Sequence, residues 1–126
     1  IVIGRSDLSK SLMISDVDNE KMLKICIELL SKKNNLNVTI GGNLMSKSFA
    51  FIRNLSKKGL YAFESRKCTF KTKVLLKKND FNSLIDSALQ FELAWLNCKK
   101  NLYGDRSQEE NLRIKTIESR LKNPNL

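Results

Sequence analysis

The sequence predicts an α/β fold built from consecutive parallel βα units. Short apolar runs at residues 1–3, 37–40 and 60–63 alternate with stretches in which apolar residues recur every three or four positions. The connections between these segments are short. Alternation of strands and helices with short connections is typical of a parallel sheet covered by helices. The length of 126 residues suits one domain or part of one.

The first unit begins with the apolar run at residues 1–3, which predicts a strand that ends at Gly4. Residues 4–11 then form a turn rich in glycine and serine. From about residue 18, apolar side chains at helical spacing predict a helix that ends at Asn34-Asn35. Acidic residues near its start favour this assignment, because carboxylates stabilise the positive end of the helix dipole.

The second and third units follow in the same order. Residues 37–40 predict a strand that stops at Gly41-Gly42-Asn43, and the helix after it closes at Gly59. Residues 60–63 predict a third strand. The stretch 68–76 is rich in lysine and is expected to be extended or irregular.

Two helices are predicted in the last part of the chain. Asp80 is expected to be the N-cap of a long helix, and Ser107 with Glu110 has the spacing of a capping box for the final one. The apolar stripe of the long helix either belongs to the core or anchors a partner, and its members include Phe91, Trp95 and Leu102. We therefore divide the chain into βα units at 1–79 and, at 80–126, a helical segment that packs on them or mediates oligomerisation.

Three βα units are too few to close a barrel. A complete (β/α)8 barrel takes ~250 residues, so the pattern predicts the C-terminal portion of a TIM barrel plus C-terminal helices. This interpretation requires more chain before Ile1 and treats the sequence as a fragment.

The composition excludes several kinds of site. The chain has no histidine, so a Ser-His-Asp triad or a histidine-bound zinc cannot form from these residues. The cysteines Cys26, Cys68 and Cys98 lack paired metal-ligand spacing and are expected to be buried reduced thiols. No apolar run approaches ~18 residues and no leader is recognisable, so we expect a soluble cytoplasmic protein without a membrane partner.

Candidate functional residues lie in the loops after the strands, where α/β folds place their sites. Asp7, with Ser9 beside it, follows the first strand and either ligates a divalent cation or caps a turn. Glu64 and Arg66 follow the third strand and are either an acid with an anion clamp or a salt-bridged rim. The loop after the second strand offers backbone N–H groups to an anion, or is a turn that needs positive φ; it comprises Gly41, Gly42 and Asn43.

Taken together, these loops resemble the HpcH/HpaI aldolase and citrate lyase β-subunit family. The stretch IGRSDLSKSL matches the family's Gly-x-x-Asp-Leu turn at Gly4 and Asp7, and TIGGNL and FESRK resemble segments of a less characterised branch. The resemblance implies a metal-dependent lyase that breaks or forms a carbon–carbon bond in a 2-oxo acid or acyl-type substrate. It implies that Asp7 ligates Mg²⁺ or Mn²⁺.

The resemblance also implies roles for neighbouring residues and for assembly. Arg66 and Glu64 are the catalytic candidates, and the substrate-binding candidates are Arg5, Ser9, Gly41, Gly42 and Asn43. Arg5 stands where better-known members have proline or threonine, so the substrate class is left open. The second metal carboxylate and the catalytic arginine would lie on earlier strands. C-terminal helices often mediate oligomers in this family, so a homo-oligomer is expected.

The charge pattern supports an alternative partner. Residues 47–78 contain ten Lys or Arg and one acid, Glu64, within a chain of net charge +10. A concentrated basic segment is typical of binding to a nucleic-acid backbone. Nucleic acid is therefore an alternative that we do not favour, because no recognition motif accompanies the lysines and they are consistent with a solvated surface. A non-catalytic barrel domain used for assembly is the remaining alternative.

Overall fold

The computed structural model describes residues 1–75, 78–104 and 107–123. Its sheet has the order β1 (Val2–Gly4), β2 (Thr39–Gly41), β3 (Ala62–Glu64) and β4 (Thr69–Lys71). The first three strands are parallel and β4 pairs with β3 in the antiparallel direction. The α/β class with parallel βα units is thus confirmed. The antiparallel β4 takes an edge of β3 at which a parallel barrel would need a parallel neighbour.

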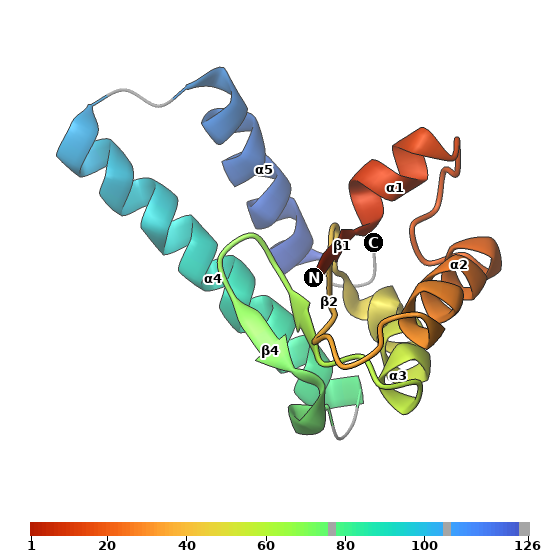
Figure 1. Cartoon of the computed structure of the whole chain (residues 1–126). Coiled ribbons are helices and arrows are strands. Elements are labelled where there is room, and N and C mark those ends of the chain that lie inside the picture. The colour runs from red at the N-terminus through yellow and green to blue at the C-terminus, as the bar shows by residue number, and fades with distance from the viewer. Residues whose placement is uncertain (76–77, 105–106, 124–126) are drawn as a thin grey trace.

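The helices lie on both sides of this sheet. On one side are α2 (Glu20–Ser31) and α3 (Phe49–Lys57), and on the other are α4 (Lys78–Tyr103) and α5 (Gln108–Lys122), which form a long hairpin (Figure 1). Short helical elements complete the order: α1 (Arg5–Ser11) follows β1, η1 (Ser46–Ser48) precedes α3, and η2 (Thr72–Val74) follows β4.

The core is formed by apolar side chains from the sheet and from both helical layers. Phe63 on β3 packs against Phe70 on β4 and Phe81 on α4, with ring centroids 5.4 and 5.5 Å apart. On the other side, Cys26 and Ile52 are fully buried on α2 and α3. Packing of α4 on β3 fixes the position of the helical hairpin, which forms one wall of the cleft described below.

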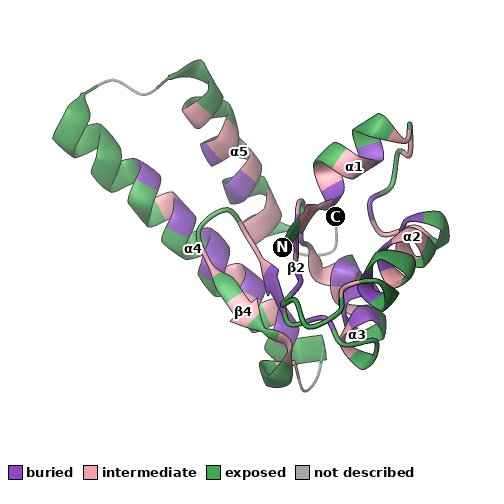
Figure 2. Cartoon of the chain, in the orientation of Figure 1, coloured by how far each residue is buried: buried purple, intermediate pink, exposed green. Residues whose placement is uncertain are grey.

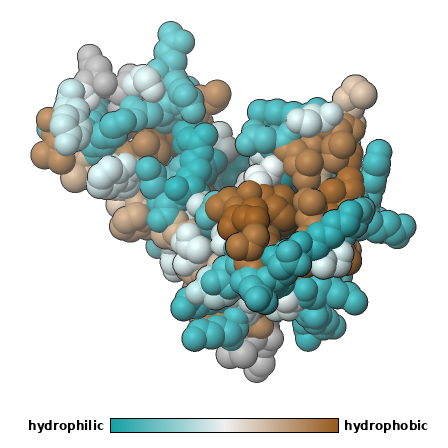
Figure 3. Space-filling view, in the orientation of Figure 1, coloured by the Kyte–Doolittle hydropathy of each residue, from teal (hydrophilic) through white to brown (hydrophobic). Residues whose placement is uncertain are grey.

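Burial along α4 is uneven. Buried residues gather in its first half, whereas its C-terminal end is exposed (Figure 2). Phe91, Trp95 and Leu102 are 53%, 47% and 70% exposed, so the prediction that they belong to the core of this chain is wrong. A second apolar patch lies at the front of the molecule over β1 (Figure 3), where Ile1 and Val2 are exposed.

Three further expectations need correction. The segment predicted as a turn after β1 is the helix α1, because Gly4 serves as an extended N-cap and Asp7 lies in the first turn, where the helix dipole favours a carboxylate. Asp80 lies inside the first turn of α4 and is not its N-cap. Cys26 is buried as expected, but Cys98 is exposed.

The predicted starts of two helices agree with the structure, but the predicted end of the first helix does not, because α2 ends at Ser31 and not at Asn34-Asn35. Asn19 caps α2 by accepting a hydrogen bond from the Met22 amide at 2.8 Å. The capping box of α5 is present, with Ser107 and Glu110 each accepting from the other's backbone N–H at 3.2 Å. Over the described ranges, no helix is both long and apolar enough to cross a membrane.

Candidate functional site

A cleft of about 720 Å³ opens at the carboxyl ends of the parallel strands. One wall comes from α1, from the loop after β2 and from the turn after β3, and the opposite wall comes from α4 and α5. Six of the eight residues predicted from the sequence line this cleft: Asp7, Ser9, Gly42, Asn43, Glu64 and Arg66. The structure therefore brings together loops that are far apart in the sequence, as the parallel order predicted.

The two acidic residues of the cleft lie over neighbouring strands. Gly4 and Gly41 are register partners in β1 and β2. A Cβ atom on Gly41 would lie only 2.9 Å from Cγ and 3.1 Å from Oε1 of Glu64, and one on Gly4 would lie 3.3 Å from Oδ2 of Asp7. Glycine at these positions leaves room for each carboxyl side chain. Because these two glycines are register partners on adjacent strands, which lie ~4.8 Å apart, both carboxylates lie at the same end of the sheet.

Arg5 lies behind this wall of the cleft. Its side chain has no exposed surface, and its guanidinium is 5.1 Å from the ring centroid of Phe51. Nε donates to the Gly41 carbonyl at 3.2 Å and Nη2 to the Gly42 carbonyl at 2.6 Å. Nη1 forms a salt bridge with Asp18. Arg5 thus joins α1 to the loop after β2, and its predicted contact with substrate stays a prediction.

The Arg5–Asp18 pair is itself held in place. Asp18 accepts a second hydrogen bond, from the buried Ser48 hydroxyl, at 2.7 Å. Burial lowers the pKa of Arg5, and the charge and hydrogen bond of Asp18 act in the opposite direction. Two carbonyls and one carboxylate therefore compensate for removing the guanidinium from water.

The loop after β2 adopts two left-handed conformations in succession. Gly42 has φ of +89°, and a Cβ there would meet the Ser6 amide nitrogen at 2.7 Å. The sequence alternative of a turn that requires positive φ is therefore confirmed for Gly42. Asn43 has φ of 48°, a conformation that asparagine tolerates better than most residues, and its side-chain oxygen accepts a hydrogen bond from Arg120 on α5.

The turn after β3 is organised by Ser65. Its amide donates to the Cys68 carbonyl at 2.8 Å, and its hydroxyl accepts from the Cys68 amide at 3.1 Å. Arg66 projects from this turn and is exposed, with Nη2 3.6 Å from Glu109 at the start of α5. Arg66 therefore belongs to a salt-bridged rim, but its partner in the described structure is Glu109 and not Glu64. Glu64 lines the cleft in the described structure and has no salt bridge there.

Sequence reasoning missed the cationic side chains on the opposite wall. Arg113 and Arg120 lie seven residues apart on α5, and both line the cleft. Arg113 forms a bidentate pair with the buried Glu92 of α4, at 2.7 and 2.6 Å. Burial lowers the pKa of Arg120, the charge of Arg113 lowers it further, and Glu92 raises it. The i, i+7 repeat was the available signal, but the sequence could not show that this face meets the cleft.

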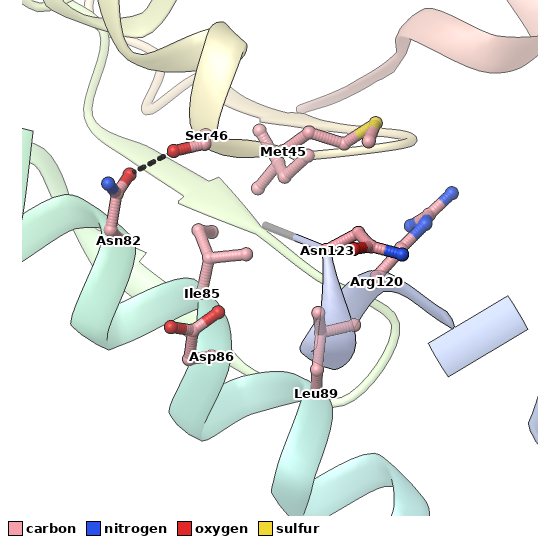
Figure 4. A pocket seen from close by; sticks show the side chains of 9 residues that line it. Met45, Ser46, Asn82, Ile85, Asp86, Leu89, Arg120 and Asn123 are labelled. Atoms are coloured by element: carbon pink, nitrogen blue, oxygen red, sulfur yellow. Dashed lines mark hydrogen bonds between the residues drawn. The ribbon is translucent and has the colours of Figure 1, made fainter. Parts of the chain in front are cut away.

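A smaller cavity of about 20 Å³ adjoins the cleft and shares Arg120 with it. In Figure 4, Ser46 and Asn82 face one another across a hydrogen bond of 2.7 Å, and Arg120 lies with Asn123 at the end of α5. The space is too small for more than one water-sized group. The main cleft is thus where a small molecule would fit.

The oxygen donors of the cleft suit a hard divalent cation. Asp7 and Glu64 supply carboxylates, and Ser6 and Ser9 supply hydroxyl oxygens, although Ser9 donates its hydrogen to the Ser6 carbonyl at 2.9 Å. Within the described ranges, no three or more His, Cys, Asp or Glu side chains form a metal-binding group. A two-carboxylate donor set still fits Mg²⁺, which commonly uses one or two protein carboxylates and fills its other positions with water and substrate oxygens.

The basic segment is spread over several elements. Lys57 is on α3, Lys67 is in the turn after β3, and Lys71 and Lys73 are on β4 and η2. Lys71 and Lys73 line a separate cavity of about 290 Å³ with Lys33 and Tyr61, at the end of the sheet away from the carboxylates. Binding of a nucleic-acid backbone by this segment stays a prediction.

No family model matches the chain, and neither a curated protein nor a solved structure matches it. The site is therefore assigned from its geometry and chemistry, and the family resemblance of the three loops stays a prediction.

Proposed function

We propose that the cleft is the substrate site of a divalent-metal-dependent enzyme that breaks or forms a carbon–carbon bond in a 2-oxo acid. The observation that carries the proposal is the convergence of three strand-end segments on one cleft, with Asp7 and Glu64 over adjacent strands. Sites of α/β enzymes lie at this end of the sheet.

The chain's own residues have distinct tasks in this proposal. Asp7 holds Mg²⁺ or Mn²⁺, with Glu64 as the second carboxylate or as the group that accepts and returns a proton at Oε1. When bound, the cation would polarise the carboxylate and keto oxygens of the substrate. Ser9 and the loop at Gly42 shape the wall beside these groups, and Arg66 at the rim contacts the anionic substrate as it enters.

The fold context belongs to the same proposal. Units β1–α2, β2–α3 and β3 would be consecutive parts of a (β/α)8 barrel, and the parallel register of the three strands supports this. Closure on β3 would require the antiparallel β4 to leave that edge. The barrel interpretation therefore requires this change in the position of β4.

Metal binding is tested by calorimetric titration of Mg²⁺ and Mn²⁺ into the wild type, Asp7→Asn and Asp80→Asn. Asp7 and Asp80 are both exposed carboxylates in the first turn of a helix, but only Asp7 lines the cleft. Loss of binding in Asp7→Asn, with binding retained in Asp80→Asn, is the expected result. Equal binding by both variants, or no binding by the wild type, contradicts the assignment of Asp7.

We also propose self-association through the exposed end of α4. Phe91, Trp95, Cys98 and Leu102 are spaced by four, three and four residues, which is the spacing of a coiled-coil seam. All four are exposed. A second copy presenting the same stripe would cover them, because an isologous contact needs a self-complementary surface.

A further inference from the structure

We infer that the cleft binds a second oxyanion, a carboxylate or phosphate, at Arg120, so that the substrate carries two anionic groups. The inference rests on the proposed function only in that the cleft is the substrate site. It comes from the wall opposite Asp7 and Glu64, which the proposed chemistry does not use.

The two arginines of this wall differ in their partners. The charge of Arg113 is neutralised by Glu92, which is 2% exposed and accepts two hydrogen bonds from the Arg113 guanidinium. Arg120 forms no salt bridge with any carboxylate of the described residues, and its Nη2 donates a hydrogen bond to the neutral amide oxygen of Asn43. The cleft therefore contains a partly buried cation that forms no salt bridge within the described part of the chain.

The position of Arg120 allows its guanidinium to bind an oxyanion in the cleft. A guanidinium carries five N–H donors, and the bond to Asn43 engages one nitrogen, so the remaining donors can meet a planar or tetrahedral oxyanion. Asn43 also fixes where the charge lies, since its left-handed backbone belongs to the loop held by Arg5. Lys10 on α1 lines the same cleft and adds positive charge.

The two anionic groups of the substrate would then lie on opposite walls. One lies near Asp7 and Glu64, where a cation would be needed to offset like charges. The other lies at Arg120. A monoanionic 2-oxo acid would leave Arg120 without a charged partner, so a dianion fits the cleft better.

The test uses succinate and inorganic phosphate in buffer freed of divalent metals by a chelating resin, so that metal binding at Asp7 has no part in it and no soluble chelator competes as an anion. Binding is measured by calorimetry for the wild type, Arg120→Gln, Arg120→Lys and the control Arg53→Gln, whose arginine is exposed on α3 outside the cleft. Circular dichroism checks that each variant is folded. Arg120→Gln should weaken binding at least ~10-fold, because a hydrogen bond to a charged group is lost. Arg120→Lys should be intermediate and Arg53→Gln unchanged.

The outcomes distinguish specific binding of an oxyanion at Arg120 from nonspecific attraction to a basic protein. Succinate affinity that depends on Arg120 supports a dicarboxylate, and phosphate affinity that depends on it supports a phosphorylated substrate. Equal loss in Arg53→Gln would indicate nonspecific attraction to a basic protein, and unchanged affinity in Arg120→Gln, or no binding by the wild type, overturns the inference. Asp7→Asn should retain anion binding under these conditions, so failure of the metal proposal and failure of this inference are distinguishable.

Discussion

Replacing Arg5 with methionine should strongly destabilise the protein. The substitution removes the salt bridge to Asp18 and hydrogen bonds to the carbonyls of Gly41 and Gly42, and it leaves the Asp18 carboxylate, only 7% exposed, with a hydrogen bond from Ser48. Breaking a buried ion pair from one side costs about 3–5 kcal/mol. A domain of this size is stable by ~5–15 kcal/mol, so the loss is a large share of the total.

Urea denaturation followed by circular dichroism measures this effect. With an m-value of ~2 kcal/mol/M, the midpoint should fall by about 1.5–2.5 M. Arg53→Met is the matched control: Arg53 also lies over a phenylalanine ring, 5.7 Å from the centroid of Phe49, but it is exposed. Its midpoint should change by less than ~0.3 M, since exposed substitutions usually change stability by no more than about 0.5 kcal/mol.

A double-mutant cycle with Asp18→Asn identifies the source of the loss. If the unpaired carboxylate dominates, Asp18→Asn should restore part of the stability lost in Arg5→Met, because the amide carries no charge to bury. Equal midpoints for Arg5→Met and Arg53→Met would refute the reasoning, since burial and partners would then contribute nothing.

Three further predictions concern the cysteines, the start of α5 and the exposed seam. Burial raises the pKa of the Cys26 thiol to about 11, so alkylation at pH 8 should modify the exposed Cys98 and spare Cys26 in the native protein. The Cys26 thiolate is disfavoured only in the folded state. The contribution of Cys26 to stability should therefore be present below pH ~9 and fall between about pH 9 and 11. A Cys26→Ala variant whose stability declines in the same way at alkaline pH would contradict this. Ser107→Ala should destabilise the protein by about 1 kcal/mol through loss of the cap, seen as a lower thermal midpoint, and an unchanged midpoint would mean that the capping box contributes nothing. The wild type should sediment as a dimer and Trp95→Gln as a monomer, whereas a wild-type monomer at ~100 µM would exclude association through α4.

The sequence predicted the parallel units well because their signals are local. Apolar runs at β2 and β3, the glycine that closes α3 and the capping box at Ser107 each depend on neighbouring residues. The loops after parallel strands lie at the same end of a sheet, which predicted that Asp7, Glu64 and Asn43 lie there together. That they line one cleft follows from this parallel order.

The features that sequence reasoning missed depend on contacts between distant segments. The partners of Arg5 are 13 to 37 residues away in the sequence, and nothing near Arg5 indicates that it bonds to two carbonyls and a carboxylate in the interior. Residues 5–11 contain one apolar side chain, Leu8, so they show no periodicity that could separate helix α1 from a turn. Arg113 and Arg120 became cleft residues only through the way α5 folds back along α4.

Because of the hydrogen bonds that Arg5 forms, the two walls of the cleft should differ in how well they tolerate substitutions. These hydrogen bonds tie the helix that bears Asp7 to the loop at Gly42, so a substitution on this wall disturbs several segments together. The facing wall comes from α4 and α5, and on α5 Arg120 contacts the loop through one side chain. Ligand preference could therefore diverge by changes on α5 while the carboxylate wall stays constant, and a library of variants at position 120 would be the direct way to retarget the cleft.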